Sequence, residues 1–570
     1  MINCLSPGQS PVSARADCPK CPILAPVLRL FTIRRVRVLV TLLILVPALL
    51  ILVDWENDPD LVFARQHPDY GYNGRIGPMR RKEFQHMKDE TYLDYTGSAL
   101  YQKAQLKDMF DRFEQNLYCN AHSNSACSER TEEEVELVRD TILDWFNASA
   151  SEYSIIFTAG TTAALKLVGE TFPWSEDSLY AYSKHNHNSV LGMRELAMQQ
   201  GASFMASEWQ LSDPEYVQQF MPSEEDLAEK ASDDDGTVWS VLDMPSDDEG
   251  AVSHLFAFPA ECNFSGIKYP LDIIHGLKDG SLGDHLLERA ERAGVVQGGW
   301  RDRDNRWRVC VDAAAFVPTN PLDLKAFPAD FVTMSFYKLF GIPTGLGALL
   351  VRNDVAPSMH KTFFGGGTVV MVSCETEYCK LRPRVYERFE DGTISFLDII
   401  GLRAGFNVFE SLGKDAITNH VWTLTQHLYQ GLTSLQHSNG NPLVEVYGNH
   451  EYGDPKRQGG IISFNVLSPS GGYIPYSTVM SDAKEEGLAI RAGAHCNPGA
   501  CYGYLDIDEA MVETIAKDRT SCGDAFDMID GHPLGSVRVS LGYPTTVSDV
   551  DRLMDFIDYH YRDYVATGFY

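Results

Sequence analysis

Short apolar runs alternate with helical patterns along most of this chain. The stretch "SEYSIIFTAG" (151–160) predicts a strand that ends in glycine, and "TTAALKLVGETF" directly after it predicts a helix. Further strands are predicted for the runs "SLYAYS", "VSHLFAFPA", "RWRVCVDAAA", "DFVTMSFYK" and "GALLVRN", which longer segments separate. Alternation of this kind indicates an α/β fold with a large domain built on a mostly parallel sheet.

The carboxy-terminal part of the chain shows a different pattern. The run "SVRVSLGY" predicts one more strand, and Thr546 with Asp549 forms a capping box that predicts the start of a helix. The apolar face of that helix is formed by Val550, Leu553, Met554 and Ile557. We therefore expect a smaller α+β carboxy-terminal lobe.

These patterns predict three regions. Residues 1–85 form a leader, residues 86–400 the large domain, and residues 401–570 the small lobe, which also takes in the amino-terminal strand region. An acidic insertion interrupts the large domain at about 209–250, where eleven acidic residues lie between Glu224 and Glu249. The composition favours a solvated surface insertion over an acidic docking site.

One segment of the leader is apolar enough to interact with a membrane. Residues 38–53, "VLVTLLILVPALLILV", carry no charge, follow four arginines and precede four acidic residues. This arrangement predicts a single-pass signal-anchor, although the segment is shorter than the roughly 20 residues of a typical span. A cleaved secretory signal or an incorrectly assigned first exon are the alternatives. The predicted location is the membrane if the segment is an anchor, and the cytoplasm otherwise.

The composition excludes some classes of function. The formal net charge of −30 argues against nucleic-acid binding, because the surface would repel a phosphate backbone. The twelve cysteines are scattered over 570 residues, which favours reduced thiols over a disulfide scaffold. Cys18 and Cys21 have a zinc-like spacing but lack a second ligand pair, so no metal site is predicted.

The candidate chemistry centres on Lys338, at the end of the apolar run "DFVTMSFYK". A lysine there is ordinary on a solvent-facing strand, but a Schiff-base lysine also needs a poorly solvated amine. Asp312 ends the preceding strand "WRVCVD", where a carboxylate suits the protonated ring nitrogen of pyridoxal 5'-phosphate. Both residues are therefore expected at the same edge of the parallel sheet.

Three more motifs supply groups that such a cofactor needs. Thr161 and Thr162 lie between a strand and a helix, where backbone amides and hydroxyls hold phosphate. His185 and His187 follow the next strand, and an imidazole there would stack on the cofactor ring. Asn263 follows the strand "HLFAFPA" and suits a hydrogen bond to a ring oxygen.

Longer stretches of the chain carry a resemblance to a known family. The segments "VDAAAFVPTNPLDLKAFPADFVTMSFYKLFGIPTGLGALLVRND", "RFEDGTISFLDIIGLRAGF", "KHNHNSVLGMRE", "CNFSGIKYPL" and "RAGAHCNPGAC" resemble the amino-terminal domain of molybdenum cofactor sulfurases. That family is related to the cysteine desulfurases within the class V aminotransferase superfamily. The resemblance covers most of residues 90–560 and implies a fold-type I pyridoxal-phosphate transferase with a seven-stranded sheet, normally a homodimer.

The resemblance also implies roles for single residues. Lys338 matches the Schiff-base lysine and Asp312 its ring-nitrogen partner, and His187 is preferred over His185 as the stacking ring. Arg538 matches the arginine that binds the substrate carboxylate. The implied ligands of the phosphate are Thr161, Thr162 and Ser335, together with Gly367 and Thr368 of the "GGGT" loop, which reaches the phosphate of the neighbouring subunit.

Cys496 matches the cysteine that takes up sulfur as a persulfide. Only a thiolate attacks the substrate sulfur, and we expect Arg491 and His495 to lower the pKa of Cys496 on a movable, glycine-flanked loop. The alternative for Cys496 and Cys501 is a disulfide or a pair of metal ligands.

The chain departs from the family pattern at several positions. Ala494 replaces a frequent second cysteine, and Tyr337 and Ala315 replace polar residues of the bacterial desulfurases. No MOSC domain, the carboxy-terminal domain that binds the molybdenum cofactor, is expected after the small lobe. The sulfur acceptor, the molybdenum cofactor or an acceptor protein, therefore stays open.

The predicted reaction converts L-cysteine to L-alanine with transfer of the sulfur to Cys496. Two rival functions remain at this point. Another class V enzyme, such as an epimerase, lyase or transaminase acting on a different amino acid, would keep Lys338 and Asp312 but would not need Cys496. A membrane-tethered protein without catalytic activity would keep the fold and dock partners through the acidic insertion.

Overall fold

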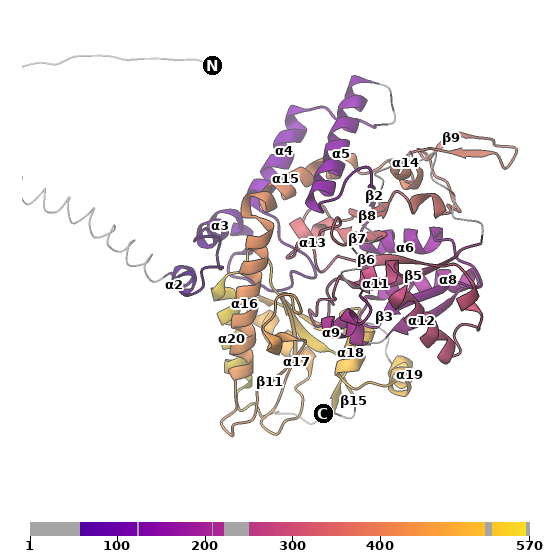
Figure 1. Cartoon of the computed structure of the whole chain (residues 1–570). Coiled ribbons are helices and arrows are strands. Elements are labelled where there is room, and N and C mark those ends of the chain that lie inside the picture. Colours follow the sequence, from indigo (N-terminus) through magenta and orange to yellow (C-terminus); the bar gives the residue numbers. More distant parts are fainter. Residues whose placement is uncertain are drawn as a thin grey trace, which may run out of the picture. The chain divides into compact units, whose positions relative to one another are not determined.

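Seven strands form the central sheet, in the order β2-β8-β7-β6-β5-β3-β4 (Figure 1). Their bounds are β2 Tyr153–Thr158, β3 Leu179–Ser183, β4 Ser203–Ser207, β5 Val252–Pro259, β6 Asn305–Asp312, β7 Phe331–Ser335 and β8 Gly347–Arg352. Neighbouring strands are parallel except that β8 runs antiparallel to both β2 and β7. The predicted mostly parallel seven-stranded sheet is confirmed.

The structure, a computed structural model, describes residues 58–121, 123, 125–207, 209–221, 250–518, 527–529 and 531–565. The helices before residue 300 are α2 Pro59–Gln66, α3 Ile76–Glu83, α4 Lys103–Gln115, α5 Ala126–Trp145, α6 Thr161–Thr171, α7 Asn188–Leu191, α8 Met193–Gln199, α9 Pro214–Gln218, α11 Ile273–Lys278 and α12 Ser281–Arg292. Those after it are α13 Phe336–Phe340, α14 Val385–Phe389, α15 Phe396–Leu412, α16 Lys414–Ser434, α17 Tyr476–Glu485, α18 Pro498–Tyr504, α19 Glu509–Asp518 and α20 Val547–Tyr561.

The central sheet is buried on both faces, because successive side chains of a strand point to opposite sides. On β5, Phe256 and Phe258 join one apolar cluster, while Leu255 and Ala257 join another. The first cluster includes side chains of α5, α11, α12 and α15, and the second includes side chains of α6, α8 and α14. The near-continuous apolar runs that predicted the strands are thus the pattern of a sheet between two helical layers.

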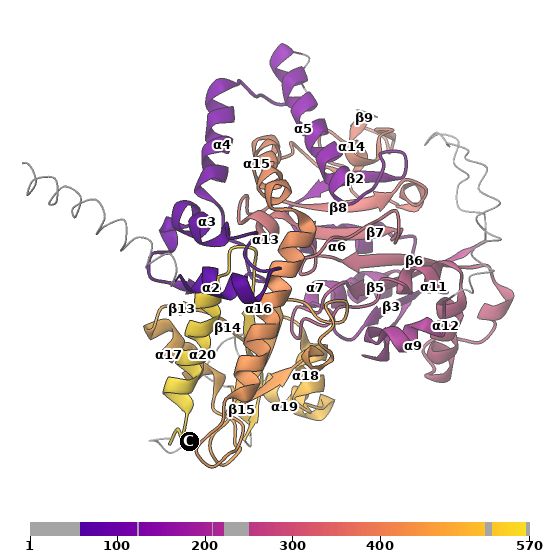
Figure 2. The same ribbon diagram turned by 60° about the vertical axis from the view of Figure 1, so that its left-hand side comes forward.

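A second sheet is entirely antiparallel and has the order β11-β12-β17-β14. Its strands are β11 Val444–Tyr447, β12 Ile461–Val466, β14 Arg491–Gly493 and β17 Ser536–Ser540. The predicted capping box is present at the start of α20, where Thr546 and Asp549 bond each other's backbone amides. Figure 2 shows α16, α17 and α20 gathered around this sheet, away from β2 and β8.

Short two-stranded pairings complete the described part of the chain. Strand β1 Thr91–Tyr92 pairs in parallel with β13 Leu488–Ala489. Strand β9 Val369–Val372 forms an antiparallel hairpin with β10 Cys379–Leu381, and β15 Met528–Ile529 pairs with β16 His532–Pro533. The pairing of β1 with β13 brings residues 91–92 beside a strand that directly precedes β14 of the second sheet, and their assignment to the small lobe stays a prediction.

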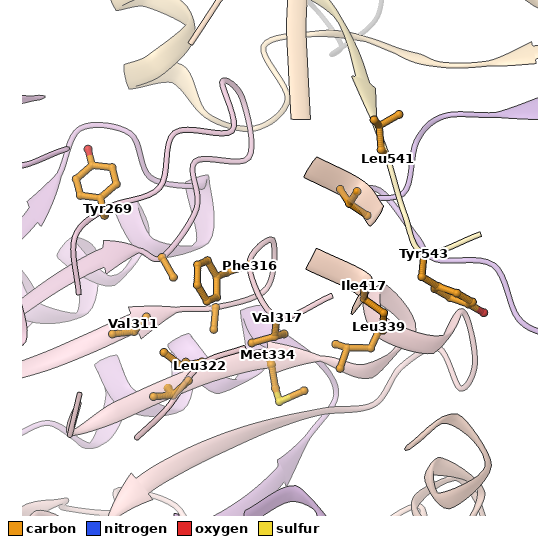
Figure 3. Packing of buried hydrophobic residues seen from close by; sticks show 14 of the residues in the cluster. Tyr269, Val311, Phe316, Val317, Leu322, Met334, Leu339, Ile417, Leu541 and Tyr543 are labelled. Atoms are coloured by element: carbon orange, nitrogen blue, oxygen red, sulfur yellow. The ribbon is translucent and has the colours of Figure 1, made fainter. Parts of the chain in front are cut away.

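The apolar core continues directly beneath the edge of the sheet where Lys338 lies. Figure 3 shows Val311 of β6, Met334 of β7 and Leu339 of α13 within one cluster, together with Phe316 and Ile417. All of these except Phe316 are at most 2% exposed. This packing gives the neighbouring polar residues a rigid base.

The leader ends earlier than the expected boundary at residue 85. Tyr70, Ile76 and Phe84 are each at most 3% exposed and belong to the main apolar cluster. The Tyr70 hydroxyl accepts a hydrogen bond from the Val547 amide, and the Tyr72 hydroxyl donates one to the Tyr543 carbonyl. The sequence did not reveal this region as folded because its aromatic residues contact segments more than 400 positions away.

Several predictions fall on residues outside the described ones. These are the apolar segment 38–53, Cys18 and Cys21, and residues 222–249 of the acidic insertion. Among the described residues, no helix has the length and hydropathy needed to cross a membrane. The domain boundary at residue 400 stays a prediction.

Candidate active site

A cavity of about 420 Å³ opens where β5, β6 and β7 end. Asp312 is the last residue of β6 and Ser335 the last of β7, so the parallel strands deliver their polar ends to one place. Seven of the predicted site residues line this cavity: Thr161, Thr162, His187, Asn263, Asp312, Ser335 and Lys338. The structure thus collects side chains from positions 161 to 338 around a single space.

Lys338 was expected at the end of a strand, but it lies on the short helix α13. Strand β7 ends at Ser335, which pairs with Gly347 of β8, and the chain then turns into α13. The backbone approaches closely here, since a Cβ on Gly347 would lie 2.5 Å from the Gly160 Cα. The expectation was wrong because the apolar residues Phe336, Leu339 and Phe340 fit a buried helix as well as a strand.

The environment of Lys338 favours a neutral amine. Burial lowers the pKa of Lys338, and the charges of Arg538 and Arg491 act in the same direction, while the Asp312 carboxylate opposes them. A lysine with a lowered pKa in a cavity is poised to act as a nucleophile or base.

Groups at the start of α6 form a cradle for an anion. The Thr161 amide donates a hydrogen bond to the Ser335 Oγ over 2.9 Å, and the two hydroxyls of these residues lie 2.8 Å apart. The Thr162 hydroxyl lies 2.9 Å from that of Ser189, which also lines the cavity. Gly160, with φ of 140°, lets the chain turn sharply from β2 into the helix. A phosphate is the anion that amides and hydroxyls at a helix start bind well.

Only one of the two candidate histidines reaches the cavity. His187 lines it, and its Nδ1 accepts a hydrogen bond from the Ser189 amide at the start of α7. His185 is instead buried between Tyr269 and Tyr504, with ring centroids 6.1 and 6.4 Å away, and burial lowers its pKa to about 4. Burial also lowers the pKa of His187, so a neutral ring faces the cavity.

Arg538 lies on β17 of the second sheet and is not among the residues that line the cavity. Its side chain is 3% exposed, and its Nη1 donates to the backbone carbonyl of Asn263 over 2.8 Å. Its Nη2 donates to the Asp94 carboxylate over 2.8 Å. Asp94 was not recognised from the sequence, because nothing in "TYLDYTGSAL" connects it with a residue 444 positions later.

The segment that carries Cys496 is fastened to the cavity wall on both sides. The Cys496 carbonyl accepts a hydrogen bond from the Asn188 amide over 2.8 Å, and the His495 carbonyl accepts one from the Asn263 side chain over 2.7 Å. His495 and Cys496 both have positive φ, of 54° and 56°, a conformation that costs energy in residues other than glycine. The Cys496 thiol is exposed, whereas Cys501 is buried.

The expected effect of His495 on Cys496 is not supported. Burial, reinforced by Arg538 and Arg491, holds the pKa of His495 well below its usual range, so its ring is neutral near pH 7. Cys496 is itself among the groups that raise the pKa of Arg538, where burial is the larger influence and lowers it. The expectation was wrong because the sequence does not show that His495 is buried.

Gly367 and Thr368 lie away from the Lys338 cavity of their own chain. Gly367 lines a separate cavity of about 190 Å³ beside the buried ion pair of Arg139 and Glu390. The Thr368 hydroxyl donates to the Gly365 carbonyl over 2.8 Å. A role at the cofactor phosphate would therefore have to be played at another copy of the chain, and it stays a prediction.

The residues of the cavity fit pyridoxal phosphate on chemical grounds. The cradle of Thr161 and Ser335 would supply donors for the phosphate, Asp312 a carboxylate for the ring nitrogen, and His187 a flat ring. Asp312 keeps one oxygen on the Ala314 amide, 3.0 Å away, which fixes its orientation. The fold and this cavity together define the class of fold-type I pyridoxal-phosphate enzymes.

Within that class, the chain belongs to the aminotransferase class-V family, whose sequence model matches residues 91–221 and 301–553. It is 41% identical to the molybdenum cofactor sulfurase of Homo sapiens over 497 residues. This alignment covers 86% of this chain and 52% of that protein. It is 41% identical over 503 residues to the molybdenum cofactor sulfurase of Arabidopsis thaliana, covering 87% of this chain and 60% of that protein. The chain thus spans about half the length of the curated relatives it matches.

Solved structures share the fold at low sequence identity. An apo cysteine desulfurase from Thermococcus onnurineus NA1 has a TM-score of 0.59 and 21% identity, over 85% of this chain and 97% of that chain. The cystine C-S lyase C-DES, in complex with its reaction product cysteine persulfide, has a TM-score of 0.54 and 15% identity, over 84% of this chain and 99% of that chain. These similarities support the fold.

Proposed function

We propose that this protein is a pyridoxal-phosphate-dependent cysteine desulfurase that forms L-alanine and a persulfide on Cys496. The observation that carries this proposal is the attachment of the Cys496 segment to the cavity through Asn188 and Asn263. A different class V reaction would need Lys338 and Asp312 but no exposed thiol on a segment that is hydrogen-bonded to the cavity wall. The epimerase, lyase and transaminase alternatives are therefore less well supported.

The cavity residues divide the work of binding and proton transfer. Pyridoxal phosphate, when bound, supplies an electron-withdrawing ring that stabilises negative charge at the α-carbon of an amino acid. Thr161, Thr162 and Ser335 would hold the phosphate, Asp312 the protonated ring nitrogen, His187 the ring face and Asn263 the ring oxygen. Arg538 would bind the substrate carboxylate, and Lys338, whose pKa burial lowers, would take and return the α-proton near neutral pH.

Sulfur transfer falls to Cys496. Its thiolate attacks the sulfur of the substrate cysteine, so that an S–S bond forms while the bond from sulfur to the β-carbon breaks. The electron pair of the broken bond stays with the carbon, which takes a proton and becomes the methyl group of alanine. Cys496 is left as a persulfide without any external oxidant.

The acceptor of this sulfur is proposed from the relatives. Molybdenum cofactor sulfurases match 86% and 87% of this chain, so the molybdenum cofactor is the first candidate and an acceptor protein the second. Because the matched region is about half of those relatives, the second transfer step is separate from the desulfurase step and is tested separately.

A homodimer is also part of the proposal. Large apolar side chains are exposed on α4 and β9 and in segments before or after these elements, and they are Phe110, Leu117, Phe363, Val370, Met371 and Tyr378. A surface of this kind marks an interface. The loop with Gly367 and Thr368 leads directly into β9, so pairing through this surface would bring it near the second copy, where the two residues would bind the neighbouring phosphate.

The test is alanine formation from L-cysteine by the full chain with cofactor and a reductant, beside Lys338→Ala and Cys496→Ser. We expect alanine and sulfide from the unaltered protein and almost none from either variant. Unchanged alanine formation by Cys496→Ser would refute the assigned nucleophile. No turnover despite bound cofactor would point to a different amino acid as substrate.

A further inference from the structure

Asp94 is a partly buried carboxylate, 19% exposed, that contacts two arginines of the second sheet. Its Oδ1 accepts the hydrogen bond from the Arg538 Nη2 over 2.8 Å, and its Oδ2 lies 3.4 Å from the Arg491 Nη1. Arg491 and Arg538 are directly opposite each other on β14 and β17. Two like charges in such a pair repel each other, so Asp94 supplies the charge that allows both to remain there.

Arg538 depends on Asp94 more than Arg491 does. The Arg491 side chain is 49% exposed and is solvated by water, whereas that of Arg538 is 3% exposed. Burial lowers the pKa of Arg538, and the Asp94 carboxylate is the largest influence that opposes this. Asp94 therefore offsets part of the cost of burying the guanidinium charge and fixes the direction of its plane.

The described contacts do not use every N–H donor of Arg538, whose guanidinium carries five. Nη1 is used by the Asn263 carbonyl and Nη2 by Asp94, but among the described residues the buried Nε has no hydrogen-bond partner. An unpaired buried donor is costly, and a ligand carboxylate would satisfy it.

The turn after β1 holds the Asp94 carboxylate in place. The Asp94 carbonyl accepts hydrogen bonds from the amides of Gly97 and Ser98, over 3.0 and 3.1 Å. The carboxylate folds back over Gly97, where a Cβ would lie only 2.3 Å from Oδ2. Glycine at position 97 is therefore required for this position of the carboxylate.

We propose that Asp94 is the positioning residue for Arg538, and that it orients the guanidinium so that its free edge binds the carboxylate of the amino-acid substrate. This inference rests on the proposed function, which assigns the substrate carboxylate to Arg538. Asp94 acts through Arg538 and takes no part in the transfer of protons or sulfur.

The test compares two ligands that differ only at the carboxylate. L-Alanine and L-alaninamide are titrated by calorimetry into the full-length holoprotein, which measures binding without turnover. The unaltered protein should prefer L-alanine by about 10- to 100-fold, the range expected of a charge-assisted hydrogen bond. In Asp94→Asn the preference should largely disappear through loss of L-alanine affinity, while L-alaninamide binds as before.

Two further variants complete the test. One displaces the Asp94 carboxylate without removing its charge, and the other removes a carboxylate elsewhere on the surface. Gly97→Ala keeps every charged group but displaces the carboxylate, so it should lose the same preference; it also decides the question if Asp94→Asn does not fold. Asp558→Asn, which removes an exposed carboxylate paired with Arg562 on the surface, should bind both ligands like the unaltered protein.

The possible failures differ from one another. Unchanged ligand preference in folded Asp94→Asn and Gly97→Ala would overturn the positioning role. Tighter binding of L-alanine by Asp94→Asn would show that Asp94 competes with the substrate, which also overturns it. No binding of either ligand to the unaltered holoprotein would contradict the proposed function, and the role of Asp94 with it.

Discussion

The Lys338 cavity and the Cys496 segment are built in opposite ways. Lys338 and Asp312 lie at the edge of a sheet buried on both faces, with the apolar cluster of Figure 3 directly beneath. Cys496 lies on an irregular stretch between β14 and α18, with an exposed side chain and a positive φ of 56°. One region holds its groups on packed strand ends, and the other presents a single thiol to solvent.

This difference fits the roles proposed for the two groups. An amine that handles protons near neutral pH needs burial, because desolvation is what lowers the pKa of Lys338. A thiol that receives sulfur and passes it on must be reachable by an acceptor, so it cannot be buried in the same way. The hydrogen bonds from Asn188 and Asn263 hold the exposed Cys496 segment against the wall of the cavity, so the thiol is open to solvent while its segment stays attached to the site.

The largest expected effect is loss of alanine formation, and the spectrum of the bound cofactor should distinguish the Lys338 cavity from the Cys496 segment. Lys338→Ala and Cys496→Ser should each lower alanine formation by on the order of a thousandfold. Only Lys338→Ala should also change the absorbance of the bound cofactor, because Cys496 does not line the cavity. Cofactor spectra and alanine assays on both proteins check this. A changed spectrum in Cys496→Ser would mean that the two regions are less independent than described.

An intermediate effect is expected for the two histidines. His187→Ala should weaken cofactor affinity by up to roughly tenfold, since an aromatic contact contributes about 0.5–1.5 kcal/mol. His185→Ala should leave that affinity nearly unchanged but lower the free energy of unfolding by about 1–3 kcal/mol, because it opens a hole beside Tyr269 and Tyr504. Cofactor titration and chemical denaturation of both variants measure the two quantities. A reversed pattern would assign the ring contact to His185.

The smallest expected effect is a shift in pH dependence. Burial lowers the pKa of Lys338 and the Asp312 carboxylate raises it, so Asp312→Asn should lower this pKa further. Only the neutral amine reacts with an aldehyde, and uptake of pyridoxal phosphate by the apoprotein should therefore become fast at a lower pH in the variant. Stopped-flow absorbance over a range of pH values measures the midpoint. A midpoint that stays in place or rises would contradict the coupling of the two charges.

Much of the architecture was predictable because it rests on local patterns. Apolar runs of five to eight residues matched β2, β3, β5, β6 and β17, and the Thr546 and Asp549 pair marked the start of α20. The resemblance to a family added the roles of residues that local pattern leaves ambiguous, such as His187. The sequence could not distinguish α13 from the end of β7, since both are short and apolar.

The sequence by itself determined that Asp312 and Lys338 lie at the ends of the apolar runs that contain two successive strands, β6 and β7, and that Thr161 follows the run that contains β2, because this pattern is local to each run. Tertiary structure alone decided which groups surround them. The antiparallel direction of β8, the burial of His495 and the contact of Asp94 with Arg538 all depend on segments far apart in the chain. Contacts between such distant segments are set by how the strands and sheets pack together, and the local periodicity of the sequence does not encode them.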